Sequence, residues 1–133
     1  LWDDYVSGFI RESVETAAGY ETCGEALDYL IDRANQFAQN ELTAKLYLTS
    51  RVQSAMYDYA GVNAWAERYR QMLVEMLRRF TACREENKLL ATASLMHVLL
   101  DSHAMKGGGI PPSAYVDDAT LRACLLAMVD TLG

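Results

Sequence analysis

The sequence predicts an all-α fold of about six helices in a single domain over residues 1–133, and two observations predict it. Along most of the chain, apolar residues recur at intervals of three and four positions, which is the spacing of one face of an α-helix. The only two prolines are adjacent, at Pro111 and Pro112, so no proline interrupts this pattern before them. Apolar residues make up 51% and charged residues 23% of the chain, which is ordinary for a globular domain.

The first two expected helices have one apolar face each. The first carries its stripe between Trp2 and Ala17 and ends near Gly19. The second begins after the stretch TCGE, which has the spacing of a capping box. In that motif the hydroxyl of Thr22 accepts a hydrogen bond from the backbone N–H of Glu25, and the Glu25 side chain reaches back. The stripe of the second helix consists of Leu27, Leu30, Ile31, Ala34 and Phe37.

The third and fourth expected helices lie on either side of Gly61. The third covers Leu42–Tyr59 and ends near that glycine. The fourth covers Val62–Arg84 and has the clearest pattern in the chain, with one apolar side and one side of mixed charge. The mixed charges indicate a helix face in water rather than a phosphate-binding surface. They are Glu67, Arg68, Arg70, Glu75, Arg78 and Arg79.

The last two expected helices are apolar on all sides. Residues 89–100 contain no charge, and residues 121–129 contain a single one, Arg122. A helix of this kind needs cover on every side, from its own domain or from another chain. We therefore expect both helices to pack against a second copy of the chain, in a four-helix seam across a twofold axis. Leu125→Asp should then split the dimer.

The stretch GGGIPPSAYVDD connects these two helices. Gly107–Gly109 end the first of them, the prolines prevent its continuation, and Asp117 or Asp118 caps the next. A glycine run can also cradle a phosphate, but that requires a strand before it and a helix N-terminus directly after it. A linker is therefore the favoured interpretation.

Composition and charge argue against several classes of function. The formal net charge is −6, so the chain is not expected to bind DNA or RNA by itself, since that binding depends on Lys and Arg. No stretch has the roughly 18 uninterrupted apolar residues of a membrane span, and no signal peptide is visible. We expect no membrane partner and a cytoplasmic location. Cys23, Cys83 and Cys124 show no CxxC spacing, and we expect reduced thiols that serve as small buried hydrophobes.

His97 and Asp101 stand in an otherwise apolar run and raise the question of a metal site. They are four residues apart, so they share one helix face. His103 is six residues beyond His97 and points elsewhere, and two ligands are too few for a protein metal site. We expect His97 to bond Asp101 or to line a cavity, with no metal and no cofactor. A helical-bundle enzyme or metal-binding protein that uses His97 and Asp101 is the alternative, although no catalytic set has a local sequence signature.

The inward stripes are rich in aromatic and thioether side chains. Buried tyrosines need hydrogen-bond partners, and methionines adapt to irregular shapes. Such a lining suits a cavity for an apolar or aromatic small molecule, and a large solid core explains the same composition. The residues are Phe9, Tyr29, Phe37, Tyr47, Met56, Tyr57, Trp65, Tyr69, Met72, Met76 and Met96.

The order of these segments is characteristic. The long amphipathic helix 62–84 is followed by EENKLLATASLMHVLLDSHAM, then by a linker and a short apolar last helix over Asp118–Leu132. Over the whole chain this layout resembles the C-terminal effector-binding and dimerisation domain of TetR-type transcriptional regulators. That family's penultimate helix often closes with a Leu-Leu-Asp-Gly-like step. Ser102 stands here in place of the glycine.

The resemblance implies a homodimer without catalytic activity that binds an apolar or aromatic effector. It also implies that DNA is bound only through an N-terminal helix-turn-helix half outside this sequence, whose operator affinity the effector shifts. A ligand-free structural dimerisation module is the remaining alternative. The implied ligand positions are Phe9, Phe37, Met56, Trp65, Tyr69, Met72 and His97. The implied seam positions are Leu95, Leu99, Ser102, Leu121, Cys124, Leu125 and Met128.

Overall fold

The structure, a computed structural model, describes residues 2–52, 60–108 and 115–133. Within these residues the chain forms six α-helices and one short 3-10 helix, and no strand. The prediction of an all-α fold of about six helices is confirmed for this part of the chain.

The first three helices are of moderate length. They are α1 (Trp2–Ala17), α2 (Cys23–Ala38) and α3 (Glu41–Val52). The capping box at the start of α2 is present in a modified form. The backbone N–H of Glu25 donates to the Thr22 hydroxyl oxygen over 3.2 Å, and that hydroxyl donates to Glu25 Oε1 over 3.0 Å.

The second half of the chain contains the two longest helices. They are α4 (Ala60–Phe80) and α5 (Glu86–Ala104), followed by the 3-10 helix η1 (Lys106–Gly108) and by α6 (Asp118–Asp130). Asp117 caps α6, as expected, by accepting the backbone N–H of Thr120 over 2.8 Å.

Several helix boundaries differ from the prediction, and the last helix, expected to reach Leu132, ends at Asp130. Gly61 does not end the third helix but lies in the first turn of α4, while α3 is described only as far as Val52. The fourth helix ends at Phe80 rather than at Arg84. There the Thr81 hydroxyl donates to the Leu77 carbonyl and accepts the backbone N–H of Cys83. It therefore supplies hydrogen-bond partners to both backbone groups where the helix ends.

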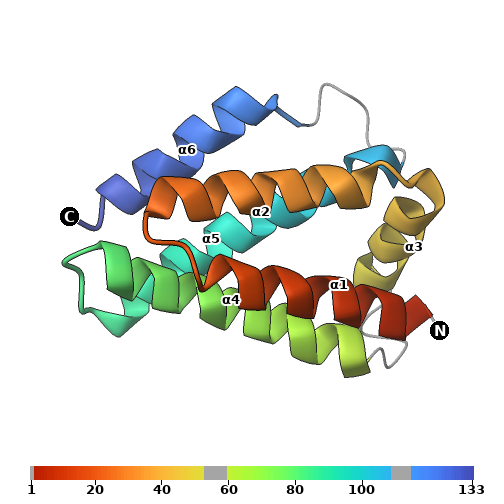
Figure 1. Cartoon of the computed structure of the whole chain (residues 1–133), viewed down its shortest axis with the longest axis horizontal. Helices are drawn as coiled ribbons and strands as arrows, with labels where there is room; N and C mark the ends of the chain where they lie inside the picture. The colour runs from red at the N-terminus through yellow and green to blue at the C-terminus, as the bar shows by residue number, and fades with distance from the viewer. Residues whose placement is uncertain (1, 53–59, 109–114) are drawn as a thin grey trace.

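The helices pack in pairs around the core (Figure 1). Helix α1 lies along α4, α2 lies along α5, and α6 lies over α2 and α5. Helix α3 crosses one end of the bundle and contacts η1. The larger buried cluster joins α2, α4, α5 and α6, and the smaller one, around Phe37 and Tyr47, lies at the α3 end.

Gly108, one residue of the glycine run, has a structural role at the α3 end. A Cβ atom on Gly108 would come within 3.0 Å of the Ala44 carbonyl, so this close approach of η1 to α3 requires glycine. In the described part of the chain, no helix combines the length and the hydropathy of a membrane span.

Candidate functional site

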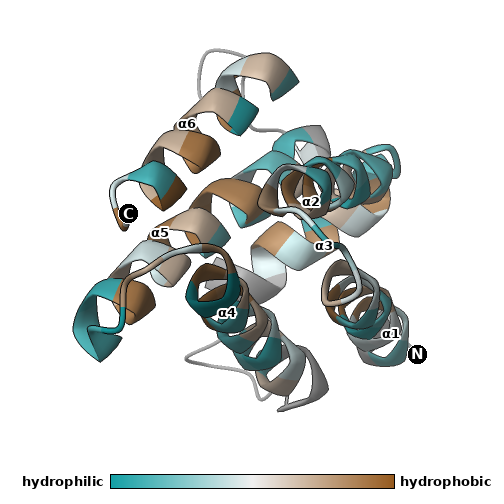
Figure 2. Cartoon of the chain, turned by 60° about the vertical axis from the view of Figure 1, so that its left-hand side comes forward, coloured by the Kyte–Doolittle hydropathy of each residue, from teal (hydrophilic) through white to brown (hydrophobic). Residues whose placement is uncertain are grey.

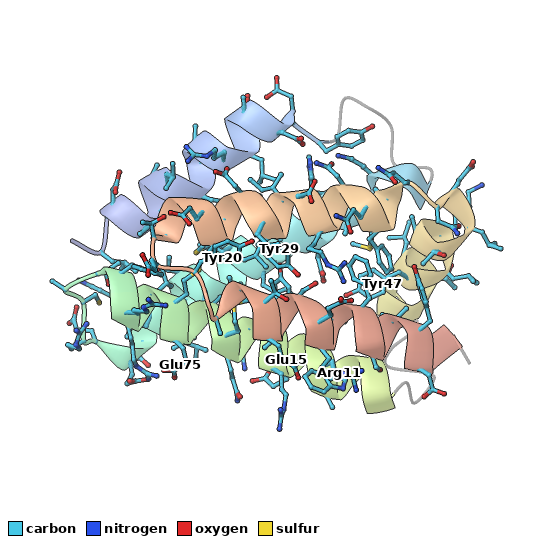
Figure 3. The ribbon with its side chains drawn as sticks, viewed as in Figure 1. Arg11, Glu15, Tyr20, Tyr29, Tyr47 and Glu75 are labelled. Carbon is cyan, nitrogen blue, oxygen red and sulfur yellow. The ribbon has the colours of Figure 1, made fainter. Side chains whose placement is uncertain are left out.

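A cavity of about 50 Å³ lies where the first five helices meet, at the α3 end of the bundle. Its walls are mostly apolar, with six polar or charged side chains among them. Tyr47 reaches into this region from α3, between α1 and α2 (Figure 3). The aromatic and polar lining residues are Phe9, Ser13, Arg33, Phe37, Tyr47, Tyr69, His97 and Asp101.

Aromatic rings form two sides of this cavity. Phe37 packs edge-on against both Phe9 and Tyr47, with ring centroids 5.2 Å apart in each pair. On the α4 and α5 side, Tyr69 and His97 are stacked with centroids 5.1 Å apart. Such contacts are worth about 0.5–1.5 kcal/mol per pair beyond burial, so the walls are held by specific ring contacts.

Arg33 joins α1 to α2 beside the cavity. Its side chain is 14% exposed, and its guanidinium carbon lies 3.7 Å above the Phe9 ring centroid. Nε donates to the Ser13 hydroxyl over 3.0 Å, and Nη2 donates to the Phe9 carbonyl over 3.1 Å. Nη2 also pairs with the exposed Glu12. The charge is therefore held by three groups of α1, while Nη1 donates to Gln36 on the same helix as Arg33.

Asp101 places a carboxylate at the opposite wall. The Tyr47 hydroxyl donates to its Oδ1 over 3.1 Å, which ties α3 to α5. His97 Nε2 lies 3.7 Å from the same oxygen, too far for a hydrogen bond. His97 thus lines the cavity, which was one of its two expected roles, while the expected bond to Asp101 is longer than a hydrogen bond.

The surroundings of Tyr69 favour its neutral, protonated form. Burial first, and then the charge of Asp101 and the neighbouring Tyr29, raise its pKa above the ordinary value for tyrosine. Its hydroxyl therefore stays protonated as a hydrogen-bonding group inside the protein.

The structure brings together four of the seven expected ligand positions: Phe9, Phe37, Tyr69 and His97 line the cavity. Trp65 packs against the same aromatic cluster without lining the cavity. Met72 is buried in the larger core cluster and does not line the cavity. Met56 lies outside the described residues.

Ser13 and Arg33 were not expected in the site from the sequence. Tyr47 was expected only as an inward aromatic residue, and Asp101 only as a metal ligand or as the bonding partner of His97. A signal for Arg33 was present, since it occupies an inward position of the α2 stripe between Leu30 and Phe37. A charge at such a position indicates either a buried ion contact or a cavity.

A second polar cluster holds the start of α6. The buried His103 places Nε2 at 2.7 Å from Asp118 Oδ1 and at 2.9 Å from Lys106 Nζ. Asn35 on α2 donates to the other Asp118 oxygen over 2.9 Å and accepts from Lys106. The cluster therefore connects α2, α5, η1 and α6.

The expected seam positions differ in how much of each side chain is exposed in the single chain. Leu121 and Leu125 are 2% and 0% exposed because they fill the chain's own core. Leu95 is 57% exposed and Cys124 is also exposed. Leu99, Ser102 and Met128 are half-buried.

The burial of the three cysteines differs from the expectation that they are buried. Cys23 and Cys83 are half-buried, but Cys124 is exposed and so does not serve as a buried hydrophobe. Among the described residues, no group of three or more His, Cys, Asp or Glu side chains has an arrangement suited to a metal ion.

No protein-family model, curated protein or solved structure significantly matches this chain.

Proposed function

We propose that this chain is the small-molecule-sensing and homodimerisation domain of a cytoplasmic, TetR-like transcriptional regulator. The observation that carries the proposal is the cavity where five helices meet, with aromatic walls and a few converging polar groups. That combination is typical of small-molecule sites, in which apolar walls supply affinity and a few polar groups fix orientation.

Sensing would occur by a change in the relative populations of a compact and an expanded conformation. The cavity of about 50 Å³ is smaller than the roughly 300–1,000 Å³ of drug-sized pockets. A ligand must therefore enlarge it, and it binds an expanded arrangement of α1–α5 better than the compact one. Any ligand with this differential affinity shifts the equilibrium toward the expanded arrangement. A coupling of about 1–3 kcal/mol would change operator affinity of the parent protein roughly 5- to 150-fold.

Dimerisation would use the outer face of α5 and α6. Leu95 and Val98, one turn apart on α5, are 57% and 61% exposed. On α6 the exposed neighbours Ala123, Cys124 and Ala127 are small and uncharged. Figure 2 shows apolar colours along α5 and the middle of α6, whereas α4 carries strongly hydrophilic turns. An uncharged face of this kind favours a second copy as its cover.

A cavity-filling variant tests the sensing function. Ala66 lines the cavity from α4 and is buried. We expect at least one of benzamidinium, benzamide and benzoate to raise the melting temperature of the wild type, and Ala66→Val to abolish the rise. A ligand present at a concentration of about a hundred times its Kd raises the free energy of unfolding by about 2.7 kcal/mol. Ala34→Val, which fills the cavity from α2, is a second variant with the same expected result. A wild type that responds to none of the three probes contradicts ligand sensing.

A surface charge tests the dimer. We expect the wild type to be a dimer in sedimentation equilibrium at micromolar concentration and Leu95→Glu to be a folded monomer. Leu42→Glu is the matched control, because Leu42 is 68% exposed on α3, away from the proposed seam. A Leu95→Glu protein that stays dimeric, or a control that dissociates equally, contradicts this seam.

A ligand-free dimerisation module is a second candidate, favoured by the small size of the cavity. A space of about 50 Å³ has room for a few water molecules beside Ser13, Arg33 and Asp101. This candidate predicts a dimer that Leu95→Glu splits and no thermal response to any of the three probes.

A further inference from the structure

We propose that α3 is the lid of the cavity and that Tyr47 holds this lid closed through its contacts with Phe37 and Asp101. The inference rests on the proposed function and deepens it, because it names the route by which a ligand reaches the cavity. It is carried by the place of α3 across one end of the bundle, by the small apolar surface that α3 buries, and by the contacts of Tyr47 with α2 and α5.

Helix α3 lies as a single layer between the cavity and the solvent. Tyr47 lines the cavity and is 4% exposed. Leu42 and Leu46, on the outer surface of the same helix, are 68% and 42% exposed. One helix thickness therefore separates the cavity from water at this end of the bundle, so a movement of α3 away from α2 opens it (Figure 1).

Opening the cavity at α3 exposes less apolar surface than separating its long walls. Among the described side chains of α3, the buried ones are Thr43, Ala44 and Tyr47, and Leu48 is half-buried. The helix packs mainly against α2 and η1. By contrast, α2, α4 and α5 each contribute a row of buried residues to the larger core cluster. Because the free energy of opening rises with the apolar area exposed, local opening is favoured at α3.

The first turn of α3 is anchored and supplies a pivot. The Asn40 side chain accepts the backbone N–H of Thr43 over 3.0 Å, which fixes the start of the helix. Gly108 of η1 lies too close to the Ala44 carbonyl to carry a side chain. Tyr47 follows Ala44 by about one turn, so a rotation of α3 about this close contact moves the Tyr47 ring out of the cavity wall.

Tyr47 supplies the contacts that close the lid. Its ring packs edge-on against Phe37, with centroids 5.2 Å apart, and its hydroxyl donates to Asp101 Oδ1 over 3.1 Å. Hydrogen bonds to charged groups are stronger than those between neutral groups. Because this bond joins α3 to α5, it breaks when the lid opens. Its removal should therefore raise the open population by about tenfold or more.

Alkylation of a cysteine inside the cavity measures the opening. Ala34 lines the cavity from α2, whereas Ala93 is fully buried in the larger core cluster. Ala34→Cys and Ala93→Cys are made singly in the full chain, and their reaction with iodoacetamide is followed by mass spectrometry. The common background carries Cys23→Ser, Cys83→Ser and Cys124→Ser. When the lid recloses faster than the reagent reacts, the alkylation rate is proportional to the open population.

The two cysteines are expected to respond differently. Ala34→Cys should react faster than Ala93→Cys and with a weaker dependence on urea, because lid opening exposes less surface than global unfolding. Tyr47→Phe, which keeps the ring and removes the hydroxyl, should speed the alkylation of Ala34→Cys by about tenfold or more.

Val74→Ala is the control for general destabilisation. Val74 is buried in the larger core cluster and does not line the cavity. Its truncation should destabilise the closed and the open forms equally relative to the unfolded chain. It should therefore speed the alkylation of Ala93→Cys and leave that of Ala34→Cys unchanged.

Two results would overturn the lid. Equal rates and equal urea dependence for Ala34→Cys and Ala93→Cys would mean that the cavity opens by global unfolding. A rate for Ala34→Cys that Tyr47→Phe leaves unchanged, or that Val74→Ala raises equally, would remove the role of Tyr47 and α3. Neither result involves a ligand, so the sensing function is decided separately by the thermal response to benzamidinium, benzamide and benzoate.

Discussion

Leu125→Asp is expected to unfold the chain rather than to separate two copies of it. Leu125 is fully buried in the larger core cluster, where α6 packs on α2 and α5. The substitution removes a leucine from close-packed surroundings and places a carboxylate there without a partner. A loss of about 4–5 kcal/mol or more is expected, which is a large part of the roughly 5–15 kcal/mol that stabilises a typical domain.

Cys124→Asp is the control for this prediction, because it introduces the same charge at the neighbouring, exposed position of α6. Circular dichroism in urea should show a native fold for Cys124→Asp and a much lower midpoint, or no folded baseline, for Leu125→Asp. If α6 belongs to the dimer seam, sedimentation should find Cys124→Asp folded and monomeric. A Leu125→Asp protein that is folded and monomeric would contradict the packing of α6 described above.

The position of Leu125 shows why the seam could be only partly predicted. The apolar period was sufficient to predict the helices, since a one-sided stripe has a definite inner face, as in α2 and α4. Helix α6 is apolar on all sides, so its sequence does not distinguish the face on its own core from the outer face. The inner face is the row Leu121, Leu125 and Val129, spaced by four residues. Cys124 differs from these in exposure but not in polarity.

The residues of the candidate site could likewise be predicted only in part. Phe9, Phe37 and Tyr69 could be expected because each lies in an inward stripe. The sequence could not show that Met72 lies away from them, because Met72 is in the same stripe of α4 as Tyr69, one turn further along the helix. The stripe passes from the cavity region into the larger core within that turn. Contacts between helices, such as Tyr47 with Asp101, depend on packing that no local pattern contains.

The cluster around His103 was also outside the reach of local patterns, and it carries the last prediction. Its four members come from segments as far apart as Asn35 and Asp118. Burial first, and then the positive charge of Lys106, lower the pKa of His103, against the opposing hydrogen bond with Asp118. Burial raises the pKa of Asp118, but its bonds with His103 and Asn35 and the charge of Lys106 outweigh this and lower it.

The wild type is therefore expected to lose stability as the pH falls below about 6.5, the ordinary pKa of histidine. In that range the unfolded chain takes up a proton that the folded chain, with its lowered His103 pKa, does not, so unfolding is favoured by acid. The contribution is fully present above pH 6.5 and is lost as the pH falls toward the folded pKa. The lowered pKa of Asp118 adds a further loss only below its ordinary value of 3.8.

His103→Leu separates this effect from general acid sensitivity. The variant should be less stable by about 1–3 kcal/mol at pH 7.5, because Asp118 and Lys106 lose their buried partner. It should also lose the decline that the wild type shows just below pH 6.5. Urea unfolding across this range measures both, and the NMR titration of the His103 ring gives the folded pKa directly. A midpoint at or above 6.5 would mean that Asp118 outweighs burial and Lys106, and that acid would strengthen the attachment of α6 instead of loosening it.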